Sequence, residues 1–431
     1  MVNERRWLML IFSLYFLLAV GYSLLMPIWE APDEPAHYHL AWHLVLTGKY
    51  ASYKLNYEAQ QPRAYYYFAS WVIRGLNLID PHSTDYFLPK EYKYNIRMPV
   101  RRFGWTDENY RFLLGEHVLR WINILFGGAA LWLNWKAFKL IVPEKPTLQL
   151  GAVALAGLTP QYLHIMSSIN NDALGTLAGA VLLFLTVRFL TKSSNYFALL
   201  LILLAILLPL STKLTVLPVS VAVLLIVVWQ WFMQFPQKRW LFYSGISVMI
   251  AAGIFYFLFP NVFDFAISEV KWRLTSLHKN ALTVKYIKAI SGQIISTFWG
   301  NVGWLAVELP KWMFYFLTAF GLSGMALQAR ELMKRDSVYV QKNIWLAVWL
   351  IVVCTILAVF RNGLTTFATQ GRFLFPVMGA LSLLMVAGWH SVASEPIQRF
   401  FPALIVLLFL SCNMILWLSG ILPVYYQPFL D

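Results

Sequence analysis

Charged residues are scarce in this chain, and acidic residues are the scarcest of them. Only 13% of its 431 residues are Asp, Glu, Lys or Arg, and only 20 are acidic. In soluble domains about a quarter of the residues are charged. The shortage excludes an ordinary soluble globular protein and draws attention to the few acidic residues that are present.

Cysteine is also nearly absent. The two cysteines, Cys354 and Cys412, both lie in apolar stretches. This placement excludes a disulfide framework and a cysteine metal site. We find no internal repeat and no low-complexity segment. Arg5 and Arg6 precede the first apolar run, and no small-residue cleavage site follows it, so we predict an uncleaved first helix.

Apolar residues are abundant: 59% of the chain is hydrophobic and its mean hydropathy is +0.60. Apolar runs long enough to cross a bilayer, roughly 20 residues each, recur along the whole chain. We therefore predict an all-α polytopic membrane protein, a single domain over residues 1–431 with about eleven transmembrane helices. The predicted spans are 7–26, 116–141, 148–166, 173–190, 196–210, 214–233, 240–259, 312–327, 344–360, 373–389 and 400–418.

Lys and Arg in the short loops define the expected orientation. Cytoplasmic loops carry an excess of these residues, which predicts a cytoplasmic N-terminus in an inner (plasma) membrane. Lys213, Arg361 and Arg372 are the exceptions on the outer side. The loops at 27–115 and 260–310 are then extracytoplasmic. Their aromatic and apolar content predicts membrane-surface helices at 33–47, 65–78, 263–277 and 281–298.

The net charge of +14 follows largely from these short basic loops. We therefore expect no nucleic-acid partner. A basic membrane protein attracts anionic membrane lipids and phosphate-bearing lipid substrates.

The stretch 27–43, PIWEAPDEPAHYHLAWH, holds the densest ionisable chemistry of the chain. Asp33 and Glu34 stand at a predicted helix start, because Pro35 suits a first turn. One interpretation is a capping carboxylate. The other is catalysis, since the positive end of a helix keeps a carboxylate ionised, as a general base or metal ligand must be. A divalent cation is left open as a cofactor, with Asp33 and Glu34 as its ligands.

His37 follows Asp33 by four residues, on the same helical face. It is a candidate to orient Asp33 or to contact substrate. His39 and His43 are interpreted as interfacial residues.

The stretch 60–67, QQPRAYYY, offers Gln61, Arg63 and Tyr66. A guanidinium fork suits phosphate oxygens, and tyrosine rings stack on sugar faces. The alternative is an interfacial aromatic belt with a snorkelling arginine.

Two further polar groups lie at predicted span ends. Asn171 and Asp172 fit a turn, yet a carboxylate at the membrane edge is also a functional candidate. Gln370 and Arg372 lie at the outer surface, where an arginine can bind a phosphate through two hydrogen bonds. Snorkelling is the alternative for Arg372.

These motifs together resemble the GT-C superfamily of integral-membrane glycosyltransferases, and within it a bacterial family. The matching stretches are PDEPAH at 32–37, QPRAYY at 61–66, NND at 170–172 and QGRFLFP at 370–376.

The resemblance implies a sugar donor carried on a polyprenyl phosphate and an acceptor that is a glycan, a lipid or a protein. It also implies that Asp33, with Glu34 beside it, supplies the catalytic base or a metal ligand. Outer-face basic residues hold the donor phosphate in such enzymes. Arg372 is the first candidate for that role and Arg63 the second.

We therefore expect glycosyl transfer with inversion on the extracytoplasmic face. Asp33 acts as base and Arg372 stabilises the departing phosphate. One alternative is a transporter or flippase of lipid-linked saccharides, which often carries charges near the membrane midplane. The predicted spans are nearly free of acidic residues there, which favours an enzyme. A ligase or polymerase that joins whole glycans stays open, as does a non-enzymatic assembly protein.

Overall fold

The structure is a computed structural model that describes residues 3–79, 110–191, 196–234, 250, 253, 260–334 and 341–426. These residues are largely helical. They include a single antiparallel ribbon, in which β1 (Asn301–Val302) pairs with β2 (Val307–Glu308). Part of the first predicted loop, residues 80–109, and nearly all of the predicted span 240–259 lie outside the described residues.

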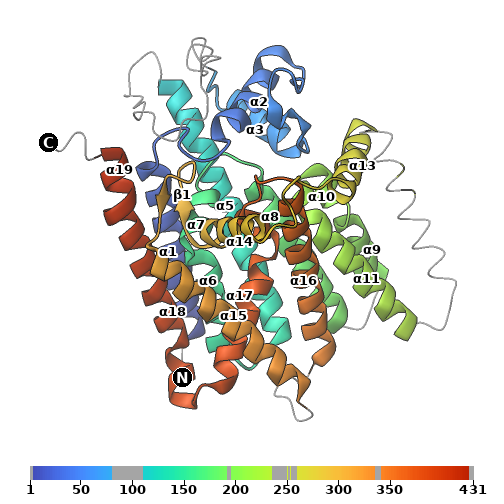
Figure 1. Cartoon of the computed structure of the whole chain (residues 1–431), viewed down its shortest axis with the longest axis vertical. Coiled ribbons are helices and arrows are strands. Elements are labelled where there is room, and N and C mark those ends of the chain that lie inside the picture. Colours follow the sequence, from blue (N-terminus) through green and yellow to red (C-terminus); the bar gives the residue numbers. More distant parts are fainter. Residues whose placement is uncertain are drawn as a thin grey trace.

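The long helices lie side by side, and most of them are upright in Figure 1. Five helices in the described part are long and apolar enough to cross a membrane: Glu4–Leu25, Asp172–Thr191, Lys342–Thr365, Gly371–Val392 and Glu395–Tyr426. Shorter apolar helices cover Pro146–Leu158, Leu201–Ser211 and Leu214–Gln230. The chain is thus a helical, multi-pass membrane protein, and its total of about eleven spans stays a prediction.

The helices of the bundle have the following bounds: α1 (Glu4–Leu25), α5 (Tyr110–Ile141), α6 (Pro146–Leu158), α7 (Pro160–Met166), α8 (Asp172–Thr191), α9 (Tyr196–Ala205), α10 (Leu208–Ser211), η2 (Leu214–Val216), α11 (Leu217–Gln234), α15 (Lys311–Met333), α16 (Lys342–Thr365), η3 (Gly371–Val377), α17 (Met378–Val392), α18 (Glu395–Leu416), η4 (Trp417–Ile421) and α19 (Leu422–Tyr426).

Helix α6 lies at the centre of the bundle. Every residue from Leu148 to Leu158 is buried, as expected of a helix that is apolar all round. Pro160 lacks an amide hydrogen, and the chain bends there into α7. The turn after α7 leads into α8 and places Asp172 at the N-terminus of that helix.

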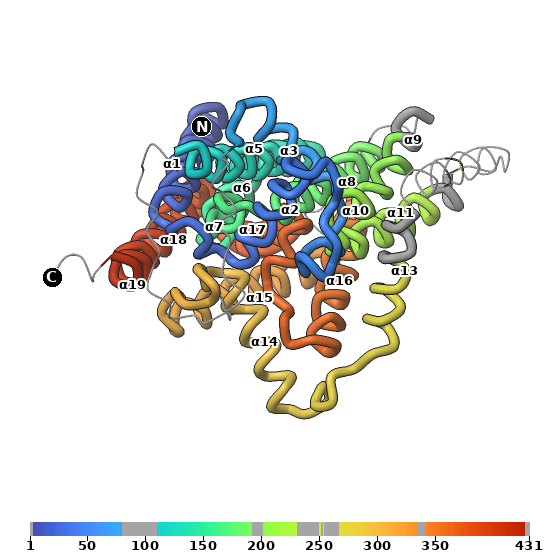
Figure 2. Tube along the Cα trace, turned by 90° about the horizontal axis from the view of Figure 1, so that it is seen from above, coloured from blue at the N-terminus to red at the C-terminus, as the bar shows by residue number. Residues whose placement is uncertain are grey.

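The segment after α1 forms a cap on one end of the bundle. It contains α2 (Glu34–Thr47), η1 (Tyr57–Gln60) and α3 (Ala64–Gly75). The cap lies at the end opposite the N-terminus (Figure 1), and from above it covers the region of α7, α8 and α17 (Figure 2). Gly48 ends α2 with φ +67° and donates its amide hydrogen to Leu44, a left-handed termination that glycine allows without strain.

The second loop contains two helices close to the predicted ones. They are α13 (Pro260–Thr275) and α14 (Val284–Trp299). Helix α14 runs across the bundle rather than along it (Figures 1 and 2).

Two glycines let η3 approach its neighbours closely. A Cβ atom on Gly371 would lie 2.2 Å from the carbonyl oxygen of Ile294 in α14. A Cβ atom on Gly179 of α8 would lie 2.0 Å from the carbonyl oxygen of Pro376. The backbone of η3 is therefore held directly against both helices, and this contact fixes Arg372, the second residue of η3.

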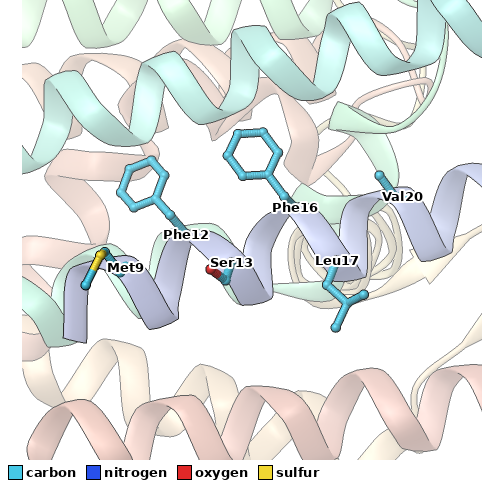
Figure 3. A pocket seen from close by; sticks show the side chains of 6 residues that line it. All are labelled: Met9, Phe12, Ser13, Phe16, Leu17 and Val20. Carbon is cyan, nitrogen blue, oxygen red and sulfur yellow. The ribbon is translucent and has the colours of Figure 1, made fainter. Parts of the chain in front are cut away.

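A groove of about 680 Å³ follows the outer face of α1 (Figure 3). Its lining is almost wholly apolar: Met9, Phe12, Ser13, Phe16, Leu17 and Val20. Phe12 packs edge-on against Trp132 of α5, with 6.2 Å between the ring centroids. None of the charged residues described below lines this groove, which is a feature separate from them.

Candidate active site

Asp33 lies at the junction between α1 and the cap. Its backbone is left-handed, with φ +64° and ψ 0°, a conformation that is uncommon for residues other than glycine. Its side chain makes no capping hydrogen bond to α2. Instead, Oδ2 accepts a hydrogen bond from Arg372 Nη2 at 2.7 Å, and Oδ1 accepts one from the Tyr57 hydroxyl at 3.0 Å. The carboxylate thus points toward η3, and capping does not account for it.

The charge of Asp33 is set by these neighbours. Burial alone would raise the pKa of its carboxyl, but the positive charge of the Arg372 guanidinium outweighs that effect. The hydrogen bonds from Arg372 and Tyr57 act in the same direction, so the pKa lies below its ordinary value. Asp33 is therefore ionised at neutral pH, as a general base must be.

Arg372 is buried, with 5% of its surface exposed. Its Nη1 atom lies 3.6 Å from Asp172 Oδ2, which is beyond hydrogen-bond distance. Neither Nε nor Nη1 has a hydrogen-bond partner among the described residues. Buried donors are seldom left unpaired in proteins, so Arg372 offers two N–H groups for a bound anion.

Asp172 and Lys213 extend the cluster of charges. Lys213 Nζ lies 2.7 Å from Asp172 Oδ1, and both side chains are less than 10% exposed. Lys213 belongs to the link between α10 and η2. The four side chains form a line of alternating charge, Asp33, Arg372, Asp172 and Lys213, which we call the charge cluster.

Glu58 of η1 adds a third carboxyl beside the charge cluster. Burial, followed by the charge of Asp33, raises the pKa of Glu58 to about 7. Lys213 and Arg372 act in the opposite direction but do not cancel this shift. Glu58 therefore changes its charge close to neutral pH.

The motif residues predicted as substrate ligands lie partly around the charge cluster. His37 is buried and lies 2.8 Å from the Tyr66 hydroxyl, with the two rings stacked. Burial lowers the pKa of His37 to about 3, so the ring is neutral at physiological pH. Asn171 Nδ2 lies 3.5 Å from Gln61 Oε1.

Gln370 and Arg63 differ in their relation to the charge cluster. Gln370 directly precedes η3, and its Oε1 atom has no hydrogen-bond partner in the described part of the chain. The guanidinium of Arg63 lies over the ring of Tyr50, 4.4 Å from its centroid. No described ion pair joins Arg63 to the charge cluster, and its role as a second phosphate ligand stays a prediction.

Glu34 has surroundings unlike those of Asp33. Its side chain is fully buried and forms a two-pronged ion pair with Arg120, with contacts of 2.7 and 2.6 Å. The backbone amides of Trp29 and Ile169 also donate to it, each at 3.0 Å. Because both carboxylate oxygens are already paired, Glu34 is not placed to act as a base or to take a metal, contrary to our expectation.

The residues present do not fit the divalent cation left open by the sequence. The carboxylates of Asp33 and Asp172 are already paired with Arg372 and Lys213, and Glu34 is paired with Arg120. Within the described ranges, no three His, Cys, Asp or Glu side chains are grouped as metal ligands. We derive no step through a metal.

Three parts of the site were not among the residues selected from the sequence: Tyr57, Glu58 and Lys213. Lys213 did carry a signal, as one of the basic residues on the predicted outer side. Tyr57 and Glu58 had none, because their place depends on how the segment between α2 and α3 folds back over Asp33.

Solved structures share this fold. ArnT from Cupriavidus metallidurans bound to undecaprenyl phosphate is similar with a TM-score of 0.51 and 12% identity, over 97% of this chain and 74% of that one. The oligosaccharyltransferase of Archaeoglobus fulgidus, in complex with zinc and sulfate, gives a TM-score of 0.48 and 14% identity, over 94% of this chain and 52% of that one. No protein-family model and no curated protein matches the chain. The chain thus shares its fold with ArnT.

Proposed function

We propose that this protein is a glycosyltransferase that moves a sugar from a polyprenyl phosphate to an acceptor hydroxyl on the extracytoplasmic face. The observation that carries this proposal is the ion pair between the partly exposed Asp33 and the buried Arg372. It combines an ionised carboxylate with a guanidinium that keeps two unpaired donors. A base for the acceptor and an anion site for the donor are therefore adjacent. The shared fold with ArnT, which was solved with undecaprenyl phosphate, supports this class of donor.

The reaction we propose is a single displacement. The acceptor oxygen forms a bond to the anomeric carbon of the sugar, and the bond from that carbon to the phosphate oxygen breaks. The electron pair leaves with the polyprenyl phosphate, and the proton of the acceptor hydroxyl passes to Asp33. One displacement inverts the configuration at the anomeric carbon.

Arg372 stabilises the leaving group in this scheme. Negative charge grows on the departing phosphate oxygen, and prearranged donors aimed at such a charge lower the barrier. The Nε and Nη1 atoms are the donors of Arg372 that have no hydrogen-bond partner among the described residues. Lys213 adds a second positive charge on the far side of Asp172. The carboxylate of Asp172 holds Lys213 in place and keeps the charge cluster electrically balanced before substrate binds.

The test uses purified full-length protein and defined polyprenyl-phosphate sugars. Asp33→Asn removes the base and should lower the transfer rate by about 10² to 10⁴-fold. Arg372→Ala removes the donors to the phosphate and should lower it by about 10² to 10³-fold.

Arg188→Ala is the matched control. This arginine is exposed in the last turn of α8, the end opposite Asp172, and its loss should leave the rate unchanged. Full transfer by both site variants contradicts the proposal. Movement of the intact donor across a vesicle membrane without transfer identifies the alternative, a flippase.

A further inference from the structure

The two oxygens of the Asp33 carboxylate have different partners. Oδ2 faces the Arg372 guanidinium at 2.7 Å, whereas Oδ1 accepts a hydrogen bond from the Tyr57 hydroxyl at 3.0 Å. An oxygen bound to a cation is the poorer proton acceptor, because the nearby positive charge favours its ionised form. The proton of an acceptor group must therefore go to Oδ1.

We infer that the Tyr57 hydroxyl occupies the position of the acceptor hydroxyl, and that the acceptor is an uncharged alcohol group which displaces it. The inference rests on the proposed function. A general base has to lie within hydrogen-bond distance of the proton that it takes. The Tyr57 phenol already forms such a hydrogen bond, with the same kind of donor group that an acceptor alcohol presents.

Tyr57 is placed so that its ring can move aside while the chain around it stays fixed. Tyr57 is 40% exposed, and exposed side chains change rotamer rapidly. The preceding residue, Asn56, is buried and anchors the turn. Its side chain donates to the Ala36 carbonyl at 2.8 Å and accepts from the Glu58 amide at 2.8 Å. Rotation of the Tyr57 ring therefore does not require η1 to leave the cap.

The charges around Oδ1 favour a neutral acceptor group. Glu58 follows Tyr57 directly and interacts electrostatically with both Asp33 and Asp172. An acceptor phosphate or carboxylate in the place of the Tyr57 hydroxyl, which lies 3.0 Å from Asp33 Oδ1, meets the ionised Asp33 carboxylate directly, and like charges repel. A hydroxyl group, on a sugar or on a lipid, meets no such penalty. It replaces the hydrogen bond that Tyr57 gives up and then passes its proton to Oδ1.

Water serves as the probe, because it is the smallest hydroxyl acceptor. In the absence of any other acceptor, purified protein is incubated with undecaprenyl-phosphate-linked sugars, and release of free sugar is measured. Tyr57→Phe keeps the ring and removes the hydroxyl. It should hydrolyse the donor about two- to tenfold faster than the wild type, the range that a single net hydrogen bond accounts for.

Tyr53→Phe is the matched control, since Tyr53 belongs to the same segment and is 60% exposed. It should hydrolyse the donor at the wild-type rate. Asp33→Asn should abolish hydrolysis in combination with either change. The unfolding temperature of Tyr57→Phe shows that the variant is folded. Tyr57→Leu, which also lacks the hydroxyl, should likewise hydrolyse the donor faster than the wild type.

The outcomes separate this inference from the proposed function. Wild-type hydrolysis that is lost in Asp33→Asn but does not increase in Tyr57→Phe overturns the inference and leaves the proposed function standing. If the wild-type protein neither hydrolyses nor transfers any sugar of the series, both are overturned. An equal increase in Tyr53→Phe also overturns the inference, because the effect then has no connection with Asp33.

Discussion

Asp33 adopts a left-handed backbone between two prolines, Pro32 and Pro35. Such a conformation costs on the order of 1–3 kcal/mol and persists where the surrounding structure enforces it. Its consequence here is the direction of the side chain. The carboxylate turns away from the N-terminus of α2, which it would otherwise cap, and reaches Arg372.

Glu58 gives the site a dependence on pH near neutrality. Because its pKa is raised to about 7, Glu58 is protonated below that pH and ionised above it. The ionised form adds a negative charge close to Asp33, Asp172, Arg372 and Lys213, and weakens their attraction for a phosphate. We expect the KM for the donor to rise by roughly three- to tenfold as the pH passes upward through this range.

The measurement is donor KM against pH for wild-type protein and for Glu58→Gln. The amide does not ionise, so the variant should keep the low KM at all these pH values. Glu395→Gln, at an exposed glutamate that begins α18, should behave like the wild type. A rise in KM that persists in Glu58→Gln would assign the titration to another group.

At the scale of elements, the pair of Glu34 and Arg120 joins α5 to three other segments. Arg120 of α5 donates to the carbonyl oxygens of Ser23 and Met26 at the end of α1, at 2.7 and 2.9 Å. Glu34 accepts from the Ile169 amide, in the turn that carries Asp172. The pair therefore fixes the end of α1, the start of α2 and the start of α8 relative to one another.

Arg120→Met should destabilise the protein by about 3–5 kcal/mol, because it leaves the Glu34 carboxylate buried and unpaired. Glu34→Gln should also destabilise the protein, because it leaves the buried Arg120 guanidinium without a counter-charge and replaces one accepting oxygen by an amide group that cannot accept. The double variant should be less destabilised than the sum of the two single variants, as expected for residues in contact. Unfolding of the purified proteins in detergent measures all three. Strict additivity would show that the two side chains act separately.

At the scale of the whole molecule, the helices follow from local properties of the sequence and the active-site contacts do not. Apolar runs locate the spans, and Gly48 and Pro35 delimit α2, because solvation and backbone geometry act over a few residues. Asp33 and Glu34 are adjacent and look alike in the sequence. Only the positions of α5 and η3 decide that Glu34 meets Arg120 and that Asp33 meets Arg372. Asp33 and Arg372 are 339 residues apart in the sequence.

The arrangement of the helices also defines two ends of the bundle, one with the cap and one with the N-terminus. Lys139, near the C-terminal end of α5, contacts Glu4 at the start of α1, with 3.0 Å between Nζ and Oε1. These residues lie at the end opposite the cap, as the N-terminus does in Figure 1. The positive-inside rule predicts that this basic end is cytoplasmic and that the charge cluster is extracytoplasmic.

Cysteine labelling in intact cells tests this orientation. Lys54→Cys introduces a thiol at an exposed position of the cap, and Arg188→Cys introduces one at the exposed far end of α8. A membrane-impermeant maleimide should label the first variant in intact cells and the second only after lysis. The wild-type chain is the control and should stay unlabelled, because Cys412 is buried and Cys354 lies in the middle of the span α16. The reverse pattern would place the charge cluster, and any transfer that it catalyses, on the cytoplasmic face.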